Sequence, residues 1–168
     1  ERCVVGFGSS GGPPMMNVLY NNHYQIVQSP GYVMIMAEMV HDARIIRLNG
    51  KHPTENITPW LGDSIGHWEG NTLVVETTNF NPQHTFRGGL RHFFAITSGA
   101  IVTERFTRIS KGQILYRFYV DDPDIYSQVW AGEMPLRSVE DKIYEYACHE
   151  GNYSMANILA GAREEEKR

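Results

Sequence analysis

Short stretches of alternating apolar and polar residues dominate the chain, and turn-forming residues separate them. Alternation with a period of two is typical of half-buried strands, and tight turns between such stretches are typical of hairpins. The predicted strands are residues 23–28, 32–39, 44–48, 64–68, 72–78, 101–109, 113–121, 125–131 and 142–149. The sequence therefore predicts an all-β, mainly antiparallel fold, a meander of about nine strands that forms a barrel or a sandwich.

Helical periodicity occurs near the end of the chain. Asn152 is a good helix N-cap, and Met155, Ile158 and Leu159 follow it at the spacing of one helix face. This pattern predicts a C-terminal helix over residues 152–163. We expect its apolar face to pack across one end of the barrel.

The length of 168 residues is that of one ordinary domain. Glycines and a Pro-Pro pair predict an irregular N-terminal arm over residues 1–20. A single β-barrel-like domain is expected over residues 21–163, followed by a charged tail over residues 164–168. Residues 80–100 have the least regular pattern in the middle of the chain, which predicts a long loop or a lid.

Composition and charge narrow the classes of function. The formal net charge is −4, and no basic stripe interrupts the mixture of acids and bases, so nucleic-acid binding is not expected. No apolar run approaches the roughly 20 residues of a membrane-spanning helix. We expect no transmembrane segment.

The two cysteines, Cys3 and Cys148, lie near opposite ends of the predicted domain. A disulfide between them would tie the N-terminal arm to the last predicted strand, and a loop of that length corresponds to about 5 kcal/mol in the chain-entropy treatment. Two unrelated buried thiols are the alternative. A disulfide would imply a periplasmic or secreted protein.

Charged residues recur inside the predicted strands. They are Glu38, Arg44, Glu76, Glu104, Arg105, Arg108, Arg117 and Glu145. Polar residues on the solvent face of a half-exposed sheet explain such a pattern, and so does a lumen that grips a polar ligand. Glu38 lies near the end of a predicted strand that is largely apolar on both faces, so it requires a partner, for which Arg44 and Arg117 are candidates.

Seven histidines raise the question of acid/base or metal chemistry. The densest clusters place His41 three residues after Glu38 and His149 directly after Cys148, although neither matches a specific ligand spacing. His41 and His149 are the candidate divalent-metal ligands or acid/base pair. In an enzyme at the barrel mouth, Glu38 and Arg44 would orient the substrate.

Several motifs together resemble those of a widespread family of exported bacterial proteins without an established activity. They are YNNHYQIVQ (20–28), HDARII (41–46), GDSIGHWEG (62–70), TLVVETTNF (72–80), ERFTR (104–108) and YACHEGNY (146–153). The resemblance extends over nearly the whole chain, with the poorest fit over residues 88–100. It implies bacterial origin and export, and it transfers no catalytic residue.

Three hypotheses of function follow. The first is an exported barrel that binds a protein partner or a ligand, as an accessory subunit of a larger assembly or through self-association. The second is a small-molecule enzyme, a lyase, isomerase or hydrolase, with a His/Glu site at the barrel mouth. The third is a lipocalin-like carrier, which requires a continuous apolar lumen.

Overall fold

An eight-stranded sheet forms most of the computed structural model, which describes residues 10–54, 57–88, 92–147 and 153–167. In sheet order, its strands are β1 (Tyr24–Ser29), β2 (Tyr32–Ala37), β3 (Ala43–Leu48), β4 (Asp63–Glu69), β5 (Thr72–Thr78), β8 (Ile101–Ser110), β9 (Gln113–Asp121) and β10 (Trp130–Arg137). A helix, α1 (Ser154–Glu165), follows the sheet. The predicted all-β, mainly antiparallel fold with a C-terminal helix is confirmed.

Three tight hairpins account for most of the sheet. They join β1 to β2, β4 to β5 and β8 to β9. Gly31 and Gly70, in the first two turns, have positive φ angles of 80° and 60°, which glycine adopts without a steric penalty. One pair departs from the meander, because β3 and β4 are parallel. Residues 49–62 provide the crossover connection that a parallel pair requires.

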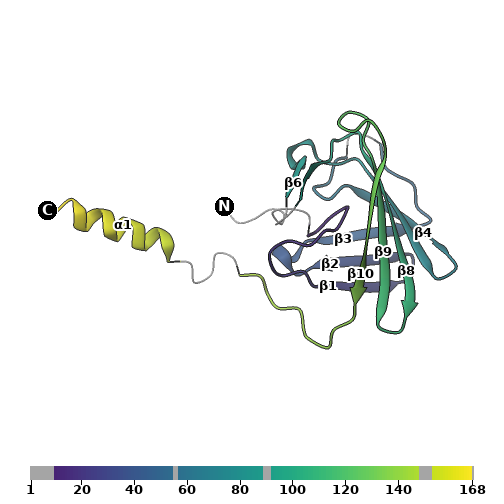
Figure 1. Ribbon diagram of the computed structural model, residues 1–168, viewed down its shortest axis with the longest axis horizontal. Coiled ribbons are helices and arrows are strands. Elements are labelled where there is room, and N and C mark those ends of the chain that lie inside the picture. The colour runs from purple at the N-terminus through teal and green to yellow at the C-terminus, as the bar shows by residue number, and fades with distance from the viewer. Residues whose placement is uncertain (1–9, 55–56, 89–91, 148–152, 168) are drawn as a thin grey trace.

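The sheet curls into a half-barrel, so that the strands at one end of the strand order, β1–β3, face the strands at the other end, β8–β10. In Figure 1, β1–β3 run across the view, and β8–β10 run nearly at right angles to them. Alternate residues point inward, so β8 buries Val102, Glu104 and Phe106. The core between the two ends contains Met15, Val33, Ile35, Ile46, Leu73, Val75, Phe80, Ile96, Ala100, Val102, Phe106, Tyr116, Phe118 and Val120.

Two predicted strands are wrong. The strand predicted over residues 125–131 overlaps β10 only at Trp130 and Ala131. Before β10 the chain turns, because the backbone N–H groups of Ile125 and Tyr126 both donate to the Asp122 carbonyl. The sequence pattern missed β10 because Gly132 and Pro135 interrupt it, although proline is tolerated in an edge strand. Residues 142–147 form no strand, and residues 148 and 149 lie outside the described residues.

The irregular region that was predicted over residues 80–100 contains small elements. A short 3-10 helix, η2 (Pro82–His84), precedes a two-stranded hairpin of β6 (Phe86–Gly88) and β7 (Phe93–Ala95). A second 3-10 helix, η1 (Met39–His41), links β2 to β3. Both 3-10 helices turn the chain at the ends of long strands.

The predicted packing of the C-terminal helix is wrong. Figure 1 shows α1 extending away from the half-barrel. Its apolar residues Met155, Ile158 and Leu159 are 68%, 65% and 48% exposed. Asn152, the predicted N-cap, lies outside the described residues. Within the part of the chain that the structure describes, no helix is long and apolar enough to cross a membrane.

Candidate functional site

A cavity of about 980 Å³ lies where the half-barrel fails to close, between the edge strands β1 and β10. We call it the seam cleft. It is lined near β1 by Asn17, Asn22, His23, Tyr24, Gln25, Ile26, Met36 and His41, at the β8–β9 turn by Arg108, Lys111, Gly112, Gln113 and Ile114, and from β10 onward by Met134, Pro135, Leu136, Arg137, Ser138, Val139, Asp141, Ile143, Tyr144 and Glu145.

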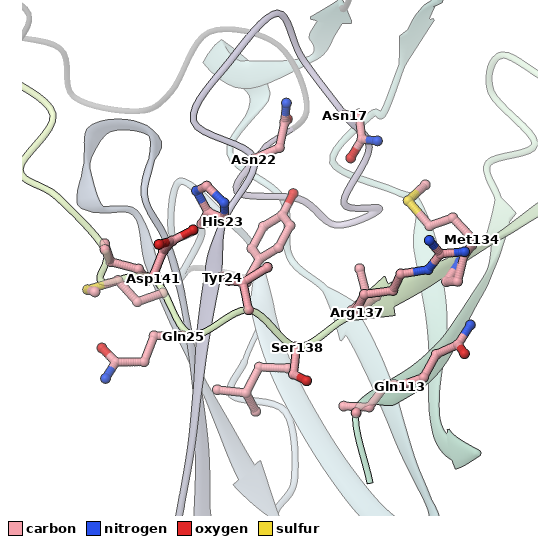
Figure 2. A pocket seen from close by; sticks show the side chains of 18 of the residues that line it. Asn17, Asn22, His23, Tyr24, Gln25, Gln113, Met134, Arg137, Ser138 and Asp141 are labelled. Atoms are coloured by element: carbon pink, nitrogen blue, oxygen red, sulfur yellow. The ribbon is translucent and has the colours of Figure 1, made fainter. Parts of the chain in front are cut away.

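Different chemistry occupies the two sides of the seam cleft. Figure 2 shows Tyr24 in the middle of the view, His23 and Asp141 on one side of it, and Arg137 and Gln113 on the other. Apolar side chains of β1, β9 and β10 contribute Ile26, Ile114, Met134 and Leu136 to the lining. The cleft therefore combines an apolar surface with polar groups at both ends, as small-molecule sites do.

Tyr24 connects the seam cleft with the interior. Its ring lines the cleft, while its hydroxyl is buried and has no hydrogen-bond partner among the described residues. Burial raises the pKa of Tyr24 to about 12, with Arg44 opposing and Glu104 reinforcing the shift. At neutral pH this phenol therefore keeps its proton and remains a potential hydrogen-bond donor.

Arg44, Glu104 and Tyr116 form a buried polar cluster next to Tyr24. The sequence predicted Glu38, and not Glu104, as the partner of Arg44. Arg44 forms two hydrogen bonds to Glu104, at 2.6 and 3.0 Å. The Tyr116 hydroxyl donates to Glu104 at 2.6 Å and accepts from the Met15 backbone N–H at 2.8 Å. Burial opposes the charge of Arg44, but Glu104 holds the Arg44 pKa above its ordinary value. Arg44 is therefore paired in the core rather than available to orient a substrate.

Glu38 and His41, two of the candidate site residues, anchor the segment after β10. One Glu38 oxygen accepts from the Tyr144 backbone N–H at 3.2 Å, and the other lies 2.8 Å from Nδ1 of His23. The Tyr146 backbone N–H donates to Nε2 of His41 at 2.9 Å. The prediction that Arg44 or Arg117 pairs with Glu38 is wrong, because His23 takes that place.

Hydrogen bonding explains the ionisation of Glu38. Burial opposes its charge, but the hydrogen bonds from His23 and from the Tyr144 backbone outweigh that effect and hold the Glu38 pKa below its ordinary value. The carboxylate is therefore ionised where it binds the segment. This arrangement gives Glu38 a positioning role at the margin of the seam cleft.

Three of the residues singled out from the sequence cannot be placed. Cys3, Cys148 and His149 lie outside the described residues, so the disulfide and the His41–His149 pair remain predictions. Among the residues that the structure describes, no group of three or more His, Cys, Asp or Glu side chains could hold a metal ion.

A second polar cluster, on the outer side of β4, was not anticipated from the sequence. Asp63 accepts two hydrogen bonds from Arg47, at 2.7 and 2.9 Å, and lies 2.6 Å from Nδ1 of His52. Burial opposes its charge, but Arg47 and His52 hold the Asp63 pKa below its ordinary value. Each of these groups already has a partner. Because His52 belongs to the crossover connection and Asp63 begins β4, the cluster ties that connection to the sheet.

Comparison with known proteins gives no independent assignment. No protein-family model, no curated protein and no solved structure matches the chain. The seam cleft and the contacts around it are therefore the basis for the functional proposal.

Proposed function

We propose that this chain is an exported binding protein that holds a small molecule in the seam cleft. The observation that carries the proposal is the position of the cleft, which is lined by residues of both edge strands of the curled sheet, β1 and β10. Its volume of about 980 Å³ is at the upper end of the range of small-molecule sites. Apolar residues for the body of a ligand lie beside polar groups that can orient it.

The packing of the interior favours the cleft over a lumen as the binding place. Large side chains, including Tyr116, Phe118 and Phe106, fill the space between the two ends of the sheet. The ion pair of Arg44 and Glu104 occupies the same interior. A lipocalin-like carrier requires a continuous apolar lumen, which this packing does not favour.

Native mass spectrometry of the protein isolated from its own source tests the proposal. We expect an adduct with the mass of a small organic molecule, and we expect Ile26→Trp to lose it by filling the cleft. Val27→Trp is the matched control, because Val27 is the next residue of β1, is 41% exposed against 40% for Ile26, and does not line the cleft. An adduct retained by a folded Ile26→Trp variant would contradict the proposal.

Export is the second part of the proposal. The resemblance to exported bacterial proteins and the pair Cys3 and Cys148 support it. Cell fractionation of the native source should place the protein outside the cytoplasm, and its mass should be lower than that of the reduced chain by the two thiol hydrogens. Recovery from the cytoplasmic fraction with both thiols free would contradict export.

Self-association or binding of a protein partner stays a prediction, and we propose α1 as the place of contact. Its exposed apolar residues support such a contact, because an isolated helix of 12 residues is marginally stable in water. The molar mass in solution, measured by light scattering, tests self-association. A dimer that becomes a monomer when Ile158 and Leu159 are replaced by serine would support it, and a monomer at all concentrations would contradict it.

A further inference from the structure

We propose that the seam cleft selects an elongated organic anion, with a single anionic head group at one end and an apolar body. This inference rests on the proposed function and specifies the class of ligand. Its basis is a group of three cations at one end of the cleft, Arg108, Lys111 and Arg137. We call this group the cationic end.

The cationic end is formed by two strands, β8 and β10, and by the turn that joins β8 to β9. Arg137, at the end of β10, pairs with Gln113 of β9, and Arg108 of β8 pairs with Ile114 of β9. Lys111 lies in the turn between β8 and β9. The Ser138 backbone N–H donates to the Gly112 carbonyl at 2.9 Å and thereby ties the end of β10 to that turn.

The three cations lack the carboxylate partners that other arginines of the sheet have. On the outer face, Arg105 binds Glu69 at 2.7 Å and Arg117 binds Glu133 at 2.6 Å. Within the described residues, no carboxylate forms an ion pair with a member of the cationic end. The Arg108 guanidinium donates to the Lys111 carbonyl at 3.0 Å, which leaves its charge without a counter-ion. An anionic ligand group would supply that counter-ion.

The rest of the lining determines the shape and polarity of the ligand. Ile114, Met134 and Leu136 continue from the cationic end along β9 and β10 and offer apolar contacts to the ligand body. Figure 2 shows Asp141 on the side of Tyr24 away from Arg137, and Glu145 also lines the cleft. Because these carboxylates repel a second anionic group, the far end of the ligand is neutral or cationic.

The three cations are neighbours along the ends of β8, β9 and β10, so together they give this end of the cleft an excess of positive charge. A single exposed ion pair contributes little to affinity, because water screens it. Several donors on one carboxylate form charge-assisted hydrogen bonds, which are about twice as strong as neutral ones. The apolar body adds affinity in proportion to the area that it buries.

Calorimetric titration with three probes of equal chain length, octanoate, octyltrimethylammonium and 1-octanol, tests the selection. We expect octanoate to bind about tenfold more tightly than either of the others. The triple variant Arg108→Gln, Lys111→Gln, Arg137→Gln should remove this preference, so that octanoate binds no more tightly than 1-octanol. The control variant Arg105→Gln, Arg117→Gln removes two outer-face cations that do not line the cleft.

The possible outcomes separate the two proposals. Equal affinity of all three probes, abolished by Ile26→Trp, would overturn the selection of anions and leave the cleft as a binding site. A preference for octanoate that the triple variant retains would also overturn the selection. If none of the three probes binds in the cleft, both proposals are contradicted. Thermal unfolding of each variant, followed by circular dichroism, establishes that it is folded.

Discussion

The interior and the seam cleft of this half-barrel differ in whether their charged side chains are paired. In the interior, Arg44, Glu104 and Tyr116 are buried and joined by hydrogen bonds of 2.6–3.0 Å. In the cleft, Lys111 and Arg137 form no ion pair with any described carboxylate. Buried charges must be paired, whereas charges in an open cleft are solvated by water and remain available to bind a ligand. The comparison separates residues that serve stability from residues that are available for binding.

The largest expected effect is the loss of the buried carboxylate. Glu104→Ala leaves Arg44 charged and unpaired in the core, so the free energy of unfolding should fall by about 3–5 kcal/mol. Urea denaturation measures the change. Glu133→Ala is the control, because it breaks the exposed pair with Arg117 and should change the free energy of unfolding very little. Equal losses in the two variants would contradict the distinction between interior and surface pairs.

Two tyrosine hydroxyls give the next comparison. Tyr116→Phe removes a hydroxyl that bonds to both Glu104 and the Met15 backbone, so it should cost about 1–3 kcal/mol of unfolding free energy. Tyr24→Phe removes a buried hydroxyl without a hydrogen-bond partner among the described residues, and should cost less than about 0.5 kcal/mol. Chemical denaturation of both variants measures the difference, and a larger loss in Tyr24→Phe would contradict the assignment.

A smaller, pH-dependent effect is expected at the margin of the cleft. The Glu38 pKa is lowered below its ordinary value of 4.5 in the folded protein, so the ionised carboxylate stabilises the fold above that pH. This contribution is lost as the pH falls through the folded-state pKa. At pH 7, Glu38→Gln should therefore be less stable than the parent by about 1 kcal/mol. The two unfolding curves should converge in acid, and a constant gap from pH 7 to pH 3 would contradict the sign.

The smallest effect concerns α1. The described residues of this helix are all exposed, so ending the chain after residue 152 should change the unfolding free energy of the half-barrel by less than about 0.5 kcal/mol. Thermal and urea denaturation of the shortened chain measure the change at low protein concentration. A drop of several kcal/mol under these conditions would show that the helix packs against its own half-barrel.

Local patterns in the sequence were sufficient for the hairpins. Alternating residues on both sides of Gly31, Gly70 and Gly112 predicted three pairs of strands that the structure contains. The edge strand β10 was missed because Gly132 and Pro135 weaken its alternation. The helix pattern was also sufficient for α1, but it carried no information about what the apolar face contacts.

The candidate site was harder to predict because its parts are distant in the sequence. Arg44 and Glu104 are separated by 60 positions, and their shared inward orientation depends on the register of β3 and β8 within the curled sheet. The seam cleft joins β1 to β10, which begin at residues 24 and 130. A signal was nevertheless present, since Glu104 alternates with the apolar residues Val102 and Phe106.

Backbone amide chemical shifts during titration with octanoate test the central claim most directly. The account predicts saturable shifts on both sides of the seam, in residues 22–26 and in residues 111–114 and 134–138. Amides of the β4–β5 hairpin turn, at Gly70 and Asn71, should not respond, because they do not line the cleft. Saturable shifts that are confined to other surfaces, or no saturable shift anywhere, would contradict the seam cleft as the binding site.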